Sequence, residues 1–274
     1  MTRRLSWPAL TLYVLLAYAI TWLAWLPGIL RQESIFEISL PLTLLGGMGP
    51  AIAAVLVTGL TEGPEGLRWL GRRLVKGRVT WYWYLTVLFL PLVLATVAMA
   101  AKYIAVGTFS GFRVPQQTNG VQAMVQAILV TFGMQTLLTG GNEELGWRGY
   151  ALPHLQGRFS AFTASIILAV IWAVWHLPLF VMKGTFQSQY PFYIFFLFTI
   201  GLTVVFSWVH NQTGGSVLMV TLFHGAVNTT AGLVQITMFD PAMILTWAGA
   251  ALVVLAAAGP KRLTRRPDSH AEAA

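Results

Sequence analysis

Cysteine is absent from this chain of 274 residues, and charged side chains are scarce. Without cysteine the chain has no disulfide, no thiolate nucleophile and no thiolate metal ligand. Charged residues make up 9% of the sequence and hydrophobic residues 56%, and the mean hydropathy is +0.68. A soluble domain of this length would carry far more charge. The composition therefore predicts a protein that lies in a membrane.

Long segments with almost no charge recur along the chain, each close to the roughly 20 residues that an α-helix needs to cross a bilayer. Eight are visible, at residues 9–30, 39–60, 80–103, 123–149, 161–182, 190–209, 214–236 and 238–258. Lipid offers the backbone no hydrogen-bond partners, so only helices or closed barrels cross it, and these segments are too long for barrel strands. We expect an all-α polytopic membrane protein with about eight transmembrane helices. Residues 1–260 would form one domain, and residues 261–274 a disordered, basic and Ala-rich cytoplasmic tail.

Acidic residues are few, 9 against 17 lysines and arginines, which gives a net charge of +8. If the N-terminus is cytoplasmic and the chain crosses eight times, 13 of the 17 basic residues fall on the inner face. This is the positive-inside bias of membrane proteins, and it predicts that both termini are cytoplasmic. The basic balance is thus explained by topology, and nucleic acid is not expected as a partner. The basic segment 61–79 reads as an amphipathic helix on the inner surface, with Trp69 and Leu70 toward lipid.

Two adjacent glutamates, Glu143 and Glu144, are the most informative residues within the predicted spans. Burying a carboxylate at membrane depth costs several kcal/mol unless it is ion-paired, solvated or part of a functional site. Neighbouring residues of a helix point about 100° apart, so the two carboxylates do not face one site. The spacing of Glu144 and Arg148 predicts an ion pair that supports the site. Glu143 is left without a partner in its own helix, between Gly140 and Gly146, so it is the candidate for chemistry.

Two other spans carry polar groups that could meet Glu143. His176 stands just before Pro178, where the missing backbone donor tends to open the helix. His224 and Asn228 lie four residues apart, on one face of the seventh span. If these residues converge, Glu143, His176 and His224 match a ligand set of hydrolytic zinc sites. The same residues also suit a metal-free site, in which Glu143 and His176 activate water while His224 and Asn228 stabilise an oxyanion.

The remaining histidines have simpler interpretations. His176 or His224 alone could be a structural hydrogen bond between helices, and we expect His154 and His210 at the interface or in solvent. The zinc-protease helix motif is absent, because no histidine in the sequence is followed by glutamate. Counting residues also places His176 deeper in the membrane than its proposed partners, which requires the fifth span to tilt or to start late.

Three motifs, in order on three spans, resemble those of the CPBP family of intramembrane proteases. This family includes the CAAX prenyl protease type II enzymes and the bacterial Abi proteins. The first motif is two glutamates, three residues and an arginine, here Glu143, Glu144 and Arg148. The second is an aromatic residue followed four residues later by histidine, with Trp172 in place of the usual Phe and His176 matching; we expect this substitution to be minor. The third is His224 with Asn228, and the detailed similarity covers residues 121–236.

The resemblance implies an eight-helix fold in a bacterial cytoplasmic membrane, with an active cavity facing the cytoplasm. It implies that Glu143 activates a water with help from His176, while His224 and Asn228 hold an oxyanion or a metal. We therefore predict an intramembrane endopeptidase for a peptide or membrane-protein substrate, with prenylated or CAAX-like tails among the candidates. Zinc is the cofactor of the metal-dependent alternative. The competing functions are a non-proteolytic relative in bacteriocin immunity or membrane scaffolding, and a proton-coupled transporter.

Overall fold

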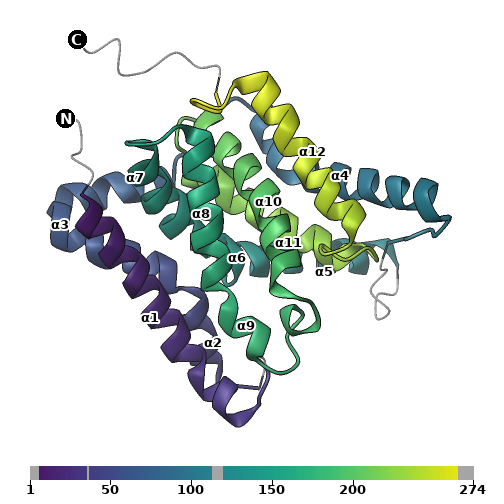
Figure 1. The fold of residues 1–274 in the computed structure, drawn as a ribbon, viewed down its shortest axis with the longest axis horizontal. Helices are drawn as coiled ribbons and strands as arrows, with labels where there is room; N and C mark the ends of the chain where they lie inside the picture. The colour runs from purple at the N-terminus through teal and green to yellow at the C-terminus, as the bar shows by residue number, and fades with distance from the viewer. Residues whose placement is uncertain (1–5, 36, 113–119, 265–274) are drawn as a thin grey trace.

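The computed structural model describes residues 6–35, 37–112 and 120–264, and most of them are helical (Figure 1). The helical elements are α1 Trp7–Arg31, α2 Leu40–Gly47, α3 Gly49–Leu74, α4 Tyr82–Val106, α5 Val121–Leu137, α6 Gly140–Glu144, η1 Leu145–Ala151, α7 Leu152–Gln156, α8 Ala161–Trp175, α9 Leu177–Val181, η2 Gln187–Gln189, α10 Phe192–Gln212, α11 Val217–Leu233 and α12 Pro241–Ala258. η1 is a π-helical turn and η2 a 3₁₀ turn. Within the described ranges, extended pairing is limited to one antiparallel bridge between Phe112 and Val234. The predicted all-α class is confirmed.

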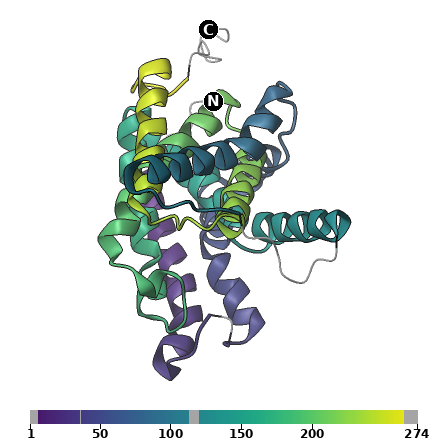
Figure 2. The ribbon, with the colours of Figure 1, turned by 90° about the vertical axis from the view of Figure 1, so that its right-hand side faces the viewer.

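Several of these helices are suited to cross a membrane. Five helical segments of the described chain have the length and apolar character, and the bent pair of α2 and α3 adds a sixth if it is counted as one span. α8 and α11 are also apolar but shorter, with 15 and 17 residues. Eight crossings and cytoplasmic termini stay predictions. The first turn of α1 and the last turn of α12 lie toward the same end of the molecule (Figures 1 and 2).

Polar side chains fix where the helices near the site begin. Ser6, Ser160 and Ser216 cap α1, α8 and α11, each accepting a hydrogen bond at 3.1–3.2 Å from the backbone N–H three residues on. Asp240 caps α12 and also forms a 2.6 Å ion pair with Lys102 of α4. Each cap supplies an acceptor to an N–H that has none within its helix. The starting points of α8 and α11, which carry three motif residues, are therefore set locally by the sequence.

α3 bends sharply before its basic end. Gly63 has a left-handed φ of +63° with ψ −158°, a conformation that favours glycine, and Pro64 follows it. The helix continues beyond this bend, as the amphipathic pattern predicted, but its orientation differs from the prediction. Leu70 is 2% exposed and belongs to the main hydrophobic core, close to Gly149 of η1. The expectation that Leu70 faces lipid is wrong, because α3 packs this side chain against η1.

The first residues of the predicted tail are ordered. The carbonyl oxygens of Pro260 and Lys261 accept hydrogen bonds at 3.0 and 2.9 Å from the first two residues of α8, and Leu263 is fully buried. These contacts attach the end of the chain to the start of α8. Residues 265–274, where the rest of the predicted disordered tail falls, lie outside the described residues.

α5 projects from the body of the protein (Figure 2). Thr136, near its C-terminal end, is its one buried residue. This end rests on α11 at Gly225, where a Cβ would overlap the Thr136 side chain. The chain then breaks at Leu138 and Thr139 before α6 begins. α5 is thus held mainly at the end that leads into the site.

Gly146 allows η1 to approach α1 and α3 closely. A Cβ there would lie 2.5 Å from the Pro50 carbonyl oxygen and 2.6 Å from the Tyr13 hydroxyl. We predict that Gly146→Ala lowers the free energy of unfolding by about 1–3 kcal/mol, as overpacking typically does. The measurement is thermal unfolding in detergent. Gly133→Ala in α5 is the matched control, because a Cβ there meets nothing within 4 Å. Equal melting temperatures for the two variants would contradict the packing argument.

Candidate active site

The motif residues converge where α6, η1, α8 and α11 meet, with α10 beside them (Figure 1). α6 carries both glutamates, η1 carries Arg148, and α11 carries His224 and Asn228. His176 is the residue at which α8 ends and α9 begins, with Pro178 in the first turn of α9. The predicted opening of the helix at this histidine is confirmed. Three segments that are apart in sequence, namely α6 with η1, the junction of α8 and α9, and α11, therefore supply one site.

Glu144 is the centre of a buried ionic cluster. Its two carboxylate oxygens accept hydrogen bonds at 2.8 and 3.0 Å from Nη1 of Arg148, and its Oε1 also accepts one at 2.8 Å from Nδ1 of His224. The guanidinium carbon of Arg148 lies 4.7 Å from the Trp172 ring centroid and 4.5 Å from that of Phe206. The predicted ion pair is confirmed. Because three helices meet in it, this cluster fixes η1 and α11 relative to one another and orients the imidazole.

Glu143 has a different environment. Its Oε2 accepts hydrogen bonds from the indole N–H of Trp172 at 2.8 Å and from that of Trp147 at 3.2 Å. Trp147 lies one turn further along the same helical segment, so the expectation that Glu143 has no partner in its own helix is wrong. Both bonds are to neutral donors, whereas Glu144 binds a guanidinium. The two adjacent carboxylates are thus divided into one that is ion-paired and one that is not.

His176 is held in a defined orientation by its own helix. Its Nδ1 lies 2.8 Å from the Trp172 carbonyl oxygen, which can only accept, so the ring hydrogen is on Nδ1. Trp175 and Phe195 contact the ring, with centroids at 4.7 and 4.9 Å. Nε2 is consequently the nitrogen with a lone pair. His176 and Glu143 are both attached to Trp172, one through its carbonyl and the other through its indole N–H.

His224 and Asn228 face α6 at a glycine. A Cβ on Gly140 would overlap Nε2 of His224 and lie 2.5 Å from Nδ2 of Asn228. Only a residue without a side chain lets the start of α6 sit this close to both groups. The structure thus places His224 and Asn228 side by side on one face of α11, as their spacing predicted. Their side-chain nitrogens lie against the segment that carries Glu143.

Exposure separates the motif residues into two groups. Glu144 and Arg148 are both 0% exposed, whereas Glu143, His176 and His224 keep 7%, 8% and 5% of their surface. Asn228 is half-buried. The described hydrogen bonds engage Oε2 of Glu143 and Nδ1 of His176, and none of them uses Oε1 of Glu143 or Nε2 of His176. All five charged or imidazole groups are buried, but only Glu143, His176 and His224 keep any exposed surface.

The residues predicted as metal ligands are not gathered around one point in the described part of the chain. The described part of the chain contains no group of three or more His, Cys, Asp or Glu side chains that could hold a metal ion. In place of the predicted set Glu143, His176 and His224, the histidine on α11 bonds Glu144 through Nδ1. Zinc stays a prediction for this site.

Trp147 and Trp172 have site contacts that the sequence analysis did not assign. Trp172 was identified only as the aromatic residue of the second motif and Trp147 was given no role, because a sequence pattern does not show where an indole N–H points. A signal was available for Trp147, which stands four residues after Glu143 and so shares its helix face. Gly140 was read only as part of a small-residue stripe. Its closeness to His224 and Asn228 depends on packing between helices.

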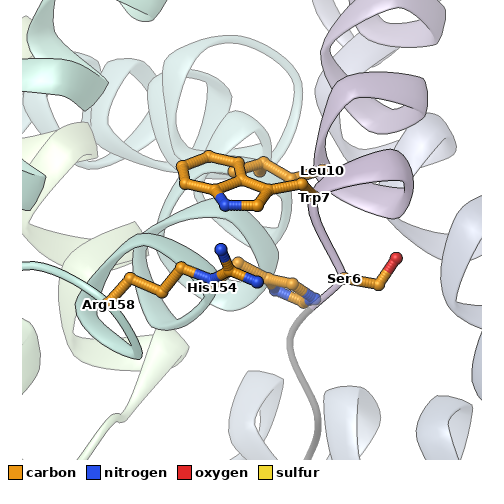
Figure 3. A pocket seen from close by; sticks show the side chains of 5 residues that line it. All are labelled: Ser6, Trp7, Leu10, His154 and Arg158. Carbon is orange, nitrogen blue, oxygen red and sulfur yellow. The ribbon is translucent and has the colours of Figure 1, made fainter.

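A separate hollow lies at the start of α1, lined by Ser6, Trp7, Leu10, His154 and Arg158 (Figure 3). There the Arg158 guanidinium is 4.9 Å from the Trp7 ring, which ties the end of α7 to α1. His154 and His210 were expected at the interface or in solvent, and at 8% and 4% exposure neither is solvated. His154 stacks on Tyr150 one turn before it, and His210 hydrogen-bonds with Arg73 of α3. The second contact connects α10 to α3 outside the motif site.

Comparison with known proteins finds sequence similarity over the segment that carries the motifs. The family model described as type II CAAX prenyl endopeptidase Rce1-like matches residues 125–230, a segment that contains all the motif residues. The CAAX prenyl protease 2 of Methanococcus maripaludis is 28% identical over 237 residues, which covers 82% of this chain and 85% of the relative. The resemblance to the CAAX prenyl protease type II enzymes, predicted from the three motifs, is therefore confirmed.

The buried ion pair gives a prediction for stability. Arg148→Met removes the cation but keeps an unbranched apolar chain, so Glu144 is left buried with one partner. We expect a loss of about 3–5 kcal/mol in the free energy of unfolding, as for other broken buried pairs. Glu144→Gln in the same chain should restore part of this loss, because it removes the uncompensated charge. Unfolding in detergent measures both variants, and equal stability of the single and double variants would contradict the pairing.

Proposed function

We propose that the protein is an intramembrane endopeptidase in which Glu143 activates the attacking water. The observation that carries this proposal is the division of the two glutamates. Glu144 is 0% exposed and ion-paired with Arg148, while Glu143 is 7% exposed and held by neutral donors. A carboxylate without a cation retains the ability to take a proton from water. The similarity to CAAX prenyl proteases supports the same reaction class.

In the proposed reaction a water molecule binds between Oε1 of Glu143 and Nε2 of His176. Its oxygen attacks the carbonyl carbon of the scissile peptide bond, and its proton moves to Glu143. The tetrahedral intermediate then collapses, the carbon–nitrogen bond breaks, and Glu143 returns the proton to the departing amine. The products are a new carboxyl terminus and a new amino terminus. His176 positions the water through the nitrogen that its bond to Trp172 leaves free.

His224 and Asn228 are proposed to stabilise the negative oxygen of the tetrahedral intermediate. The Asn228 amide is a donor in its ordinary state. His224 is held through its Nδ1 by Glu144, so its Nε2 is the ring nitrogen directed to the same side as Asn228, and an imidazolium donates from that atom. Donors that are already in place where charge develops lower the barrier without reorganisation at the moment of reaction. Gly140 permits both groups to lie on the same side of the site.

The substrate is proposed to be a peptide or membrane-protein segment, with a prenylated CAAX-like tail as the first candidate. The curated relative is named a CAAX prenyl protease, which motivates this choice. We propose that the protein resides in the cytoplasmic membrane with the site toward the cytoplasm, in keeping with the distribution of basic residues. The prenyl group of such a substrate would lie in the bilayer, and its peptide would reach the polar residues of the site.

Removal of the proposed base tests this function. Purified protein in liposomes would be incubated with prenylated CAAX peptides and a peptide library, and products identified by mass spectrometry. We expect Glu143→Gln to lower kcat by about 10²–10⁴-fold or more, since a carboxamide accepts no proton. Glu65→Gln, an exposed glutamate on α3, is the matched control and should cleave like the unaltered chain.

Incubation with a chelator tests whether the proposed reaction proceeds without a metal ion. We expect cleavage to persist after incubation with a strong zinc chelator. Loss of cleavage that added zinc restores would overturn that form and return zinc to the site. Cleavage by Glu143→Gln at the unaltered rate would overturn the role of the glutamate. A folded chain that cleaves no peptide in the set would favour the immunity or scaffold alternative.

A further inference from the structure

Trp172 contacts more motif residues than any other side chain described above. Its indole N–H donates to Glu143, its carbonyl oxygen accepts from His176, and its ring face lies 4.7 Å from the guanidinium of Arg148. The ring also meets the His224 imidazole nearly edge-on, with centroids 5.5 Å apart. The Trp172 side chain is 3% exposed and is thus fixed by its surroundings. One residue therefore joins the proposed base, its assisting histidine and the ionic cluster.

The bond from Trp172 to Glu143, like that of Trp147, differs from the bonds of three other tryptophans of α1 and α8. Trp22 and Trp25 donate to backbone carbonyls at 3.0 and 3.4 Å, and Trp175 donates to the Thr21 hydroxyl at 2.8 Å. Those bonds satisfy a buried N–H with a neutral acceptor, as a purely structural tryptophan requires. Trp172 gives its N–H to a carboxylate instead. A hydrogen bond to an ionised acceptor is stronger and more directional than a neutral one.

Two indoles hold the same carboxylate oxygen from different elements. Trp147 reaches Oε2 from η1 and Trp172 reaches it from α8. One donor would leave the carboxylate free to rotate about its last torsion, which is soft for glutamate. A second donor on the same atom restricts this rotation. Oε2 is then the anchored oxygen, and Oε1 is presented to the free side of the site.

We propose that Trp172 is a positioning residue for Glu143, and that its indole N–H anchors Oε2 so that Oε1 faces the water. This inference rests on the proposed function of Glu143 as the base. The resemblance predicted that tryptophan in place of the usual phenylalanine is a minor change. The geometry indicates that the replacement matters. Phenylalanine would offer its ring face to Arg148 but has no N–H to donate to Glu143.

Kinetics of Trp172→Phe test the proposal. The variant keeps an aromatic ring against Arg148 and removes the N–H. We expect kcat to fall about 10- to 100-fold with KM nearly unchanged, because a misoriented base affects the chemical step and not substrate binding. Trp25→Phe is the matched control: its indole is also 3% exposed and hydrogen-bonded, but to the Thr43 carbonyl between α1 and α2. It should keep kcat. Unaltered kcat in Trp172→Phe, or an equal fall in both variants, would overturn the proposal.

A spectroscopic measurement tests the same bond without relying on cleavage. The protein would be labelled with ¹⁵N-indole tryptophan in detergent, and the Trp172 signal assigned by its absence in Trp172→Phe. In Glu143→Gln we expect the Trp172 indole proton to move upfield, because the acceptor becomes neutral, while the Trp25 signal stays in place. An unmoved Trp172 signal would overturn the proposal. If the signal moves but no peptide is cleaved by the unaltered chain, the anchor stands and the proposed function fails.

Discussion

The buried contact of Glu144 with Arg148 and His224 is the interaction on which the arrangement of the site depends. Transferring a carboxylate and a guanidinium out of water costs several kcal/mol for each ion, so neither is tolerated there alone. The structure offsets this cost with two hydrogen bonds between the ions, a third from His224 and two aromatic rings about the cation. Each compensating group comes from a different element. Satisfying one ion pair therefore draws η1, α8, α10 and α11 together.

This cluster also explains why Glu143, the neighbouring glutamate, has different hydrogen-bond partners. Because Glu144 takes the arginine, Glu143 is left to neutral donors, and the 100° between adjacent residues turns it toward α8. There it meets Trp172 and the end of the helix that carries His176. The π-helical turn begins directly after the two glutamates, and turns of this kind are frequent at functional sites. Within it Gly146 and Gly149 let α1 and α3 pack tightly behind the site.

The sequence predicted those features that depend on local spacing. Apolar run lengths predicted the helices, the i,i+4 spacing predicted the pair of Glu144 with Arg148, and Pro178 predicted the break at His176. Features that depend on how helices rotate against each other were missed. Leu70 was placed toward lipid although it packs on η1, and nothing in the order of residues showed that His224 would bond Glu144 and not Glu143. The direction in which an indole N–H points also depends on how helices rotate against each other. From the sequence, Trp172 was therefore only a replacement for phenylalanine.

The depth of the site in the membrane depends on the length of each helix and on how the helices pack against each other. At 1.5 Å per residue, the 15 residues of α8 span roughly 22 Å, less than the roughly 30 Å of a bilayer core. His176, at its end, therefore lies inside the membrane if α8 starts at the cytoplasmic surface. His224 is the eighth residue of α11 and only about 10 Å from its start. The Trp172 and His224 rings nevertheless lie 5.5 Å apart, which requires the two helices to tilt or to start at different levels.

The helix ends at His176 itself. α9 begins at the next residue, and the imidazole stays beside Trp172, one turn back in α8. α5 is buried only at Thr136, near the end that leads into α6, and the rest of the helix projects from the protein. Glu143, His176 and His224 are 7%, 8% and 5% exposed, so the site is nearly closed to solvent. Exclusion of water strengthens the hydrogen bonds and charge contacts inside such a site.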